Sequence, residues 1–203
     1  MEHFVITIAR QYGSGGRTIG EALAKRLGVR YYDKNLIRLA SDESGIDEAM
    51  FGRVDEHSRD RVPLFVRPQA YNGELISSPD DREFTSDRNL FNYQAKAIRE
   101  VAGASSCVII GRCSNYILKD EPYVLRVFIH AGWAYRMERA AEKLSMSPKE
   151  IERFLKKDDR RKEEFSLRYT GHHWADATQY DLCLDSGRFG DEGCIEQIMK
   201  MLE

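Results

Sequence analysis

The hydrophobic pattern at the start of the chain predicts a strand, a turn and a helix in close succession. Residues 4–9 form a mostly apolar, β-branched run, which is typical of a strand buried on both faces of a parallel sheet. Apolar residues then recur at every fourth position over 19–27, and Gly28 follows as a helix C-cap. Residues 29–32 predict a second short strand that ends at Asp33. This succession is typical of a βαβ unit.

Later parts of the chain continue the alternation of strands and helices. Further strands are predicted over 107–110, 123–129 and 180–184, and helices over about 89–103, 132–144, 148–167 and 193–202. Such alternation predicts an α/β domain of three layers around a parallel sheet. The stretch from 42 to 88 is polar and holds three of the five prolines, so we expect one or two helices and a long loop there.

Length and charge narrow the possible partners. The 203 residues suit one large domain, and 31 Lys and Arg against 33 Asp and Glu leave a net charge of −2. A balanced charge argues against polymeric nucleic acid as the partner. The chain lacks an apolar run of about 18 residues and a basic leader, so we expect no membrane partner and a cytoplasmic protein. The four cysteines form no C-x-x-C pair, which indicates free thiols in a reducing compartment.

A glycine cluster between the first strand and the first helix carries the strongest functional signal. Backbone N–H groups at such a turn form a nest for anions, and the helix dipole adds positive potential. Glycines allow phosphate oxygens to approach closely and permit positive φ. The segment ends in Gly-Arg-Thr, which fits the end of the P-loop pattern except that Arg17 replaces Lys. The candidate phosphate-binding residues are Gly13, Ser14, Gly15, Gly16, Arg17 and Thr18, with Thr18 also the candidate magnesium ligand.

Two other interpretations of the glycine cluster remain open. Gly13 and Gly15 also fit the dinucleotide pattern, and Asp33 follows at a suitable distance. Thr18, however, occupies the position of the third glycine, where close packing of helix on strand requires Gly. We therefore favour a phosphate loop over a dinucleotide site, while a purely structural turn stays possible. Arg17 offers phosphate a planar fork where lysine would offer a point charge.

Several motifs together resemble the cytidylate-kinase-like family, a bacterial branch of the P-loop nucleoside monophosphate kinases. They are the glycine loop and residues 31–33, 108–112, 126–129 and 174–182. The resemblance extends over nearly the whole chain and is weakest over 42–88. It implies a three-layer P-loop kinase fold with a five-stranded parallel sheet in the order 2-3-1-4-5. It also implies one domain over 1–203, with an acceptor-binding region at about 34–105, a mobile basic lid at about 150–172, ATP as donor and Mg²⁺ as metal.

The chain departs from the family pattern at three places. Arg17 replaces the lysine of the phosphate loop, Lys34 and Asn35 replace Thr and Gly after Asp33, and Cys113 replaces Asp after Gly111 and Arg112. These departures lie in the donor and acceptor motifs. They leave the identity of the acceptor open.

Arginines and one aspartate at the predicted strand ends are the other candidate site residues. Ligands bind at this edge of open α/β sheets, and the resemblance puts the acceptor phosphate near Arg112, although a structural salt bridge is the alternative. Arg38 is a second acceptor-phosphate candidate. Asp33 could hold the acceptor or orient its attacking oxygen, and it could also cap the next helix. The candidate catalytic residues are Arg17, Asp33, Arg112, Arg160 and Arg161.

Arg160 and Arg161 belong to a mixed-charge run at 156–162. The resemblance puts this run in the lid, where its arginines would close over the donor phosphates. A solvated helix face is the alternative. Arg136 and Arg139, on the helix after the fourth strand, could also face the phosphates.

The leading hypothesis is an ATP- and magnesium-dependent kinase with a phosphate-bearing small-molecule acceptor, and CMP is the first candidate. The same fold could instead phosphorylate another metabolite. A nucleotide-binding sensor without turnover is the alternative from a different class. His172 and His173 lack further ligands at metal-binding spacing, so we expect no role for them in the site.

Overall fold

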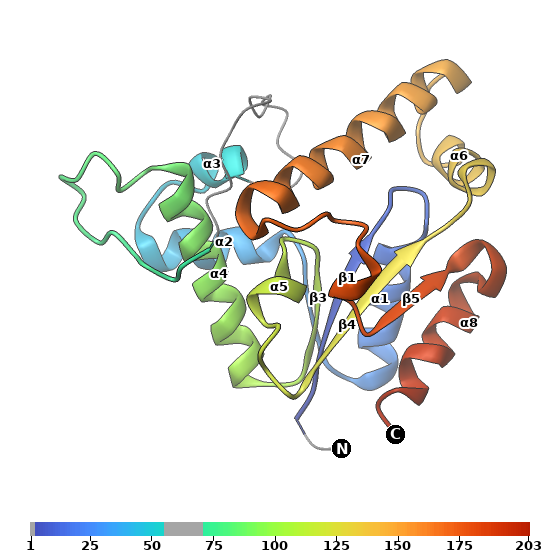
Figure 1. The fold of residues 1–203 in the computed structure, drawn as a ribbon, viewed down its shortest axis with the longest axis horizontal. Coiled ribbons are helices and arrows are strands. Elements are labelled where there is room, and N and C mark those ends of the chain that lie inside the picture. The colour runs from blue at the N-terminus through green and yellow to red at the C-terminus, as the bar shows by residue number, and fades with distance from the viewer. Residues whose placement is uncertain (1–2, 55–70) are drawn as a thin grey trace.

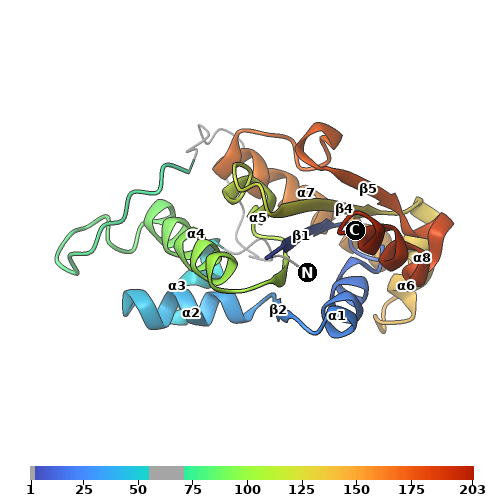
Figure 2. The same cartoon turned by 90° about the horizontal axis from the view of Figure 1, so that it is seen from below.

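The computed structural model describes residues 3–54 and 71–203 of the chain. Five parallel strands form one sheet in the order β2-β3-β1-β4-β5, and helices cover both of its faces (Figure 1 and Figure 2). The strands are β1 (Val5–Arg10), β2 (Arg30–Tyr32), β3 (Cys107–Ile110), β4 (Val124–His130) and β5 (Leu182–Asp185). The predicted three-layer fold and the predicted strand order are confirmed.

Strand β1 is the centre of the sheet, and all six of its residues are buried. Val5 pairs with Cys107 of β3 on one side and with Val124 of β4 on the other. Side chains on a strand alternate between the two faces, so a central strand covered by helices on both faces needs apolar residues at successive positions. This explains the mostly apolar run at the start of the chain.

The two faces of the sheet pack as two separate hydrophobic cores. Ile6 and Ile8 join the core under α1 (Gly16–Leu27) and α8 (Ser186–Lys200), which breaks at Gly190. Val5 joins the core on the other face, which the helices α2 (Asn35–Ser44), α4 (Asp87–Ala104) and α5 (Ser114–Ile117) share with the C-terminal part of α7 (Pro148–Thr170).

The polar stretch between β2 and α4 contains short helices and irregular chain. After α2 come α3 (Glu48–Phe51) and a 3-10 turn (Gly52–Val54). The irregular chain after residue 70 is tied to the rest, because Tyr71 donates to the Tyr169 carbonyl and Ile76 to the Asn89 side chain. The described parts fit the prediction of one or two helices with a long loop, and the rest of the predicted loop, 55–70, lies outside the described residues.

The predicted lid region is one helix. α6 (Trp133–Ala141) leads to α7, a helix of 23 residues that begins with a capping box of Ser147 and Glu150 and with Pro148 in its first turn. A second 3-10 turn (Ala177–Gln179) precedes β5. None of the helices in the described ranges is long and apolar enough to cross a membrane.

Candidate active site

The glycine loop between β1 and α1 has a backbone that only glycine adopts easily. Gly13 and Gly15 have φ of 80° and 79°. A Cβ atom on Gly13 would lie 2.5 Å from the Arg136 carbonyl oxygen, and one on Gly16 would lie 2.4 Å from the Cβ of Arg10. The loop therefore needs glycine both for its conformation and for its close packing.

Buried side chains hold the loop in place. The Ser14 hydroxyl lies 2.9 Å from the Gln11 carbonyl oxygen and 3.0 Å from that of Ile129 in β4. The Ser186 hydroxyl donates to the Ser14 carbonyl oxygen at 2.6 Å, so the start of α8 is also hydrogen-bonded to the loop. The predicted binding residue Ser14 thus uses its hydroxyl inside the fold.

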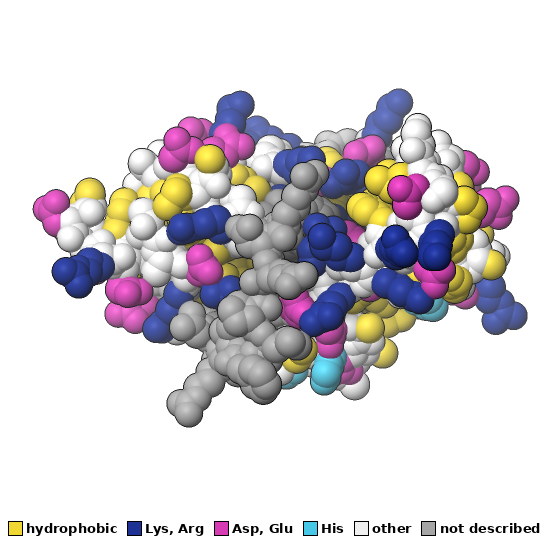
Figure 3. Space-filling model, turned by 90° about the horizontal axis from the view of Figure 1, so that it is seen from above, with side chains coloured by type: hydrophobic (Ala, Val, Ile, Leu, Met, Phe, Trp, Pro, Cys, Tyr) yellow, Lys and Arg dark blue, Asp and Glu magenta, His cyan; other side chains and the backbone are white. Residues whose placement is uncertain are grey.

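A cavity of about 370 Å³ lies against the glycine loop. Its walls come from the loop, the start of α1, the end of α6 and its following turn, and the inner side of α7. Among the described residues that line it, Asp158 is the one acid, while seven are basic: Arg10, Arg17, Lys34, Arg139, Lys143, Arg161 and Lys162. Figure 3 shows Lys and Arg side chains gathered on this face of the molecule. A polyanion fits such a cavity.

Three of the predicted catalytic residues meet around Asp33. Its carboxylate Oδ2 lies 2.7 Å from the guanidinium Nη2 of Arg17, and its backbone carbonyl accepts a hydrogen bond from Arg112 Nε at 3.2 Å. The other carboxylate oxygen, Oδ1, is buried and accepts no hydrogen bond from the described residues. The structure therefore joins the glycine loop, the end of β2 and the end of β3 at one carboxylate.

The two candidates for an acceptor phosphate lie off the cavity wall. Arg112 is 1% exposed, has a left-handed φ of 58°, and also contacts Gln94 Oε1 through Nη1 at 3.5 Å. Arg38 lies on α2 with a 75% exposed side chain, 3.8 Å from Asp42. Neither residue belongs to the described lining of the cavity.

The mixed-charge run on α7 has two different sides. Arg161 and Lys162 line the cavity and share the carboxylate of Asp158, at 3.1 and 2.6 Å. Arg160 is 62% exposed, pairs with Glu164 one turn away, and is not part of the described lining. Only part of the run, therefore, faces the site.

The cations of the mixed-charge run have acidic partners. Acidic residues on the same helix neutralise the cations: Glu152 pairs with Lys156, Asp158 with Arg161 and Lys162, and Glu164 with Arg160. These ion pairs reduce the repulsion within the run, and α7 contacts the start of the glycine loop through Lys162, which donates to the Arg10 carbonyl oxygen.

Two arginines of α6 support the site. Arg136 is buried, makes a two-pronged ion pair with Asp159 of α7, and donates to the Tyr12 carbonyl oxygen at 2.7 Å. Arg139 lines the cavity and makes a two-pronged ion pair with Asp191 of α8, and this contact raises the pKa of Arg139. Arg136 therefore fastens the loop to α7, while Arg139 presents a cation beside Gly15.

Aromatic residues close another side of the cavity. The rings of Tyr12 and Phe154 meet edge to face, with centroids 4.8 Å apart, and both residues line the cavity. Burial, followed by the nearby Asp158 carboxylate, raises the pKa of Tyr12. The Tyr12 hydroxyl thus remains protonated at neutral pH.

Besides Arg10 at the end of β1, the sequence pattern did not single out two buried residues of the cavity, Asp158 and Lys162. The signal for them was the i,i+4 spacing of an acid and a base inside the mixed-charge run, a spacing that puts the two side chains on one helix face. The pattern could not show that this face is the buried one.

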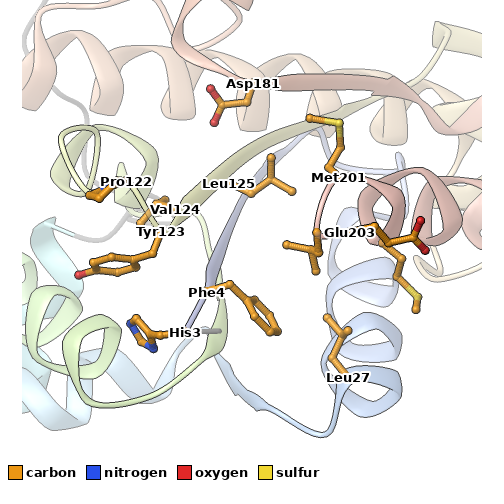
Figure 4. A pocket seen from close by; sticks show the side chains of 12 residues that line it. His3, Phe4, Leu27, Pro122, Tyr123, Val124, Leu125, Asp181, Met201 and Glu203 are labelled. Atoms are coloured by element: carbon orange, nitrogen blue, oxygen red, sulfur yellow. The ribbon is translucent and has the colours of Figure 1, made fainter. Parts of the chain in front are cut away.

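A larger hollow of about 1210 Å³ lies at the opposite edge of the sheet (Figure 4). Phe4, Leu27, Leu125 and Met201 are among its lining residues, and the described lining contains no Lys or Arg. A phosphate would find no cation there. Of the two cavities, the one at the glycine loop has the cationic lining that a phosphate would need.

Comparison with known proteins agrees with this geometry. Residues 5–188 match the cytidylate kinase-like family. The chain belongs to this family. A cytidylate kinase from Methanothrix thermoacetophila is 25% identical over 195 residues, which cover 94% of this chain and 93% of that protein. A cytidylate kinase from Methanopyrus kandleri is 24% identical, covering 93% and 87% of the two chains.

Solved structures agree on the fold. An uncharacterized protein from Eubacterium ventriosum superposes with a TM-score of 0.71 at 22% identity, over 98% of this chain and 97% of that one. A shikimate kinase from Bacteroides thetaiotaomicron gives a TM-score of 0.55 at 13% identity, over 98% of both chains. These structures confirm the predicted fold, while the family match and the two cytidylate kinases confirm the predicted family and the assignment as a kinase enzyme.

Proposed function

We propose that this protein transfers the γ-phosphoryl group of ATP to a phosphate-bearing small molecule, with CMP as the first acceptor to test. The cation-lined cavity on the glycine loop is the observation that carries the proposal. Membership of the cytidylate kinase-like family supports the choice of CMP. Residues of about 34–105 would form the acceptor side, and those of about 150–172, mostly α7, would cover the donor.

In this proposal the glycine loop binds the donor. The N–H groups from Gly13 to Thr18 and the dipole of α1 would hold the ATP phosphates. The donor set also suits Mg²⁺, which prefers oxygen ligands and keeps several waters: Thr18 lines the cavity and its hydroxyl would hold the metal together with phosphate oxygens and water. Bound Mg²⁺ would neutralise part of the phosphate charge.

The transfer itself requires charge and alignment rather than covalent help from the protein. An acceptor oxygen forms a bond to the γ-phosphorus while the bond from that phosphorus to the β,γ-bridging oxygen breaks, and ADP leaves. Arg17 would stabilise charge on the acceptor side of the transferring phosphoryl group, because its guanidinium is bound to Asp33. Asp33 would fix the acceptor.

A hydroxyl-bearing metabolite is the second candidate acceptor, and one observation favours it. Asp33 Oδ1 is buried without a hydrogen-bond partner among the described residues. An acceptor hydroxyl could donate to this oxygen, and the carboxylate could then take its proton during transfer. A phosphate acceptor is already ionised at neutral pH and needs no such base.

The test is ADP formation by the full chain with ATP, Mg²⁺ and a panel of acceptors. The panel contains CMP, other nucleoside monophosphates and hydroxy acids. Turnover that depends on CMP supports the first candidate, and turnover with a hydroxy acid alone supports the second. ATP binding without any acceptor-dependent ADP would instead favour the sensor.

Asp33→Asn separates the two acceptor chemistries by the size of its effect. With a hydroxyl acceptor, loss of a general base should lower kcat by about 10²–10⁴-fold. With a phosphate acceptor, loss of one charged contact should raise the acceptor KM by roughly tenfold and leave the KM for ATP within about twofold. A matching thermal melting curve is the control for folding.

Arg161→Ala and Arg160→Ala form a matched pair on neighbouring positions of α7. We expect Arg161→Ala to lower kcat by roughly tenfold or more, because Arg161 lines the cavity. Arg160→Ala removes the exposed ion pair with Glu164, so it should lower the free energy of unfolding by at most about 0.5 kcal/mol and leave kcat unchanged. Steady-state kinetics decide. Equal kcat values in the two variants would show that Arg161 has no role in the reaction.

A further inference from the structure

The P-loop pattern expects a lysine at residue 17, and the structure has no lysine there. Arg17 occupies the position and turns to Asp33 at the end of β2, 2.7 Å away. Because this carboxylate holds it, the Arg17 guanidinium lies toward the proposed acceptor side. The donor phosphates, which the pattern assigns to the loop lysine, need another point charge.

Lys162 of α7 has the position and the burial for this task. Its side chain is 3% exposed and lines the same cavity as the glycine loop. Nζ donates to the carbonyl oxygen of Arg10 at 3.2 Å, and Arg10 is the residue at which β1 ends and the loop begins. The ammonium group therefore lies beside Arg10, where the loop begins, and reaches it without any movement of α7.

The local structure fixes this ammonium group. Asp158 Oδ2 accepts from Nζ at 2.6 Å, and the charge also lies 5.6 Å from the centre of the Trp174 ring. The neighbour of Asp158, Asp159, is held by Arg136, which also donates to the Tyr12 carbonyl of the loop. The helix segment that carries Lys162 is thus attached to the loop at a second point.

Stability alone does not explain a lysine at this place. A buried ion pair usually contributes little more than apolar side chains of the same volume, because removing two charges from water costs about as much as their attraction returns. A compact ammonium group beside a phosphate-binding loop has an evident use, since it presents a point charge to phosphate oxygens.

Resting on the proposed function, we infer that Lys162 takes over the task of the missing loop lysine. It binds the terminal phosphates of a nucleoside triphosphate, while Arg17, bound to Asp33, serves the acceptor side. Asp158 is a positioning residue that holds the Lys162 ammonium group beside the loop.

The test is calorimetric titration of the full chain with ATP and Mg²⁺, and separately with adenosine. Lys162→Met should weaken ATP binding roughly ten- to a hundredfold and leave adenosine binding within about twofold, because the side chain meets only phosphate. Arg17→Met should weaken ATP binding by less than about threefold and raise the acceptor KM instead. Lys157→Met, an exposed lysine on the same helix, is the control and should bind ATP normally.

Lys162→Met leaves Asp158 buried without its lysine, so folding needs its own control. The double variant Lys162→Met/Asp158→Asn removes both charges together and should show the same loss of ATP affinity. The inference is overturned if either Lys162 variant binds ATP like the parent, or if Arg17→Met loses as much ATP affinity. A parent protein that binds no ATP would overturn the proposed function as well, whereas a parent that makes ADP limits the failure to Lys162.

Discussion

Replacing Gly13 with alanine should abolish ATP binding and lower the free energy of unfolding by about 2–5 kcal/mol. The backbone there has φ of 80°, and the new Cβ would lie 2.5 Å from the Arg136 carbonyl oxygen and 2.9 Å from the Arg136 Cα. Both contacts are with backbone, so no side-chain rotation relieves them. The loop would have to move away from α6, and its N–H groups would move with it.

Gly28→Ala is the matched control for that variant. Gly28 has nearly the same left-handed conformation, with φ of 67°, but a Cβ there meets nothing within 4 Å. It should lose about 1–2 kcal/mol from backbone strain alone and bind ATP like the parent. Chemical denaturation and ATP titration measure the two effects, and equal behaviour of the two variants would show that the loop tolerates the close contact.

Arg136→Met should lower the free energy of unfolding by about 3 kcal/mol and weaken ATP binding. The variant keeps the bulk of the side chain but removes the two-pronged ion pair with Asp159 and the hydrogen bond to the Tyr12 carbonyl. Asp159 would be left partly buried without its partner. The junction of loop, α6 and α7 would loosen at the same time.

Arg126→Met provides the comparison, because Arg126 also makes a two-pronged ion pair, with Asp181, at a more exposed place. We expect it to cost about 1 kcal/mol or less and to leave ATP binding intact, since the pair lies outside the described cavity lining. Urea denaturation of both variants measures the difference between their free energies of unfolding. A loss for Arg136→Met no larger than that for Arg126→Met would make the Arg136 junction an ordinary surface pair.

The sequence was sufficient for features that depend on local pattern. The apolar run of β1, the glycine turn and the C-cap at Gly28 each have a local cause, and together they predicted the first strand, the first helix and the position of the loop, whereas the strand order was implied by the family resemblance. The partners of Arg17 and Asp33 could not be predicted from the local pattern. Both residues were candidates, but their ion pair joins α1 to the end of β2 and depends on how the helix rotates on the sheet.

Side-chain direction was the part that the sequence could not supply. Arg160 and Arg161 are neighbours with the same chemistry, and only the packing of α7 decides that Arg161 lines the cavity while Arg160 faces solvent. Arg112 was correctly expected at the end of β3, but its left-handed backbone and its burial under Asp33 result from tertiary packing. Asp158 and Lys162 were hidden among surface charges for the same reason.

The separation of the two cores has a consequence for how such an enzyme diversifies. The glycine loop is rooted in the core shared by α1 and α8, whereas α2 and α4, which flank the proposed acceptor side, pack in the core on the opposite face of the sheet. Substitutions in one core leave the packing of the other largely undisturbed, because the sheet lies between them. We expect natural or laboratory selection for a new acceptor to concentrate its changes in α2 and α4, leaving the glycine loop intact.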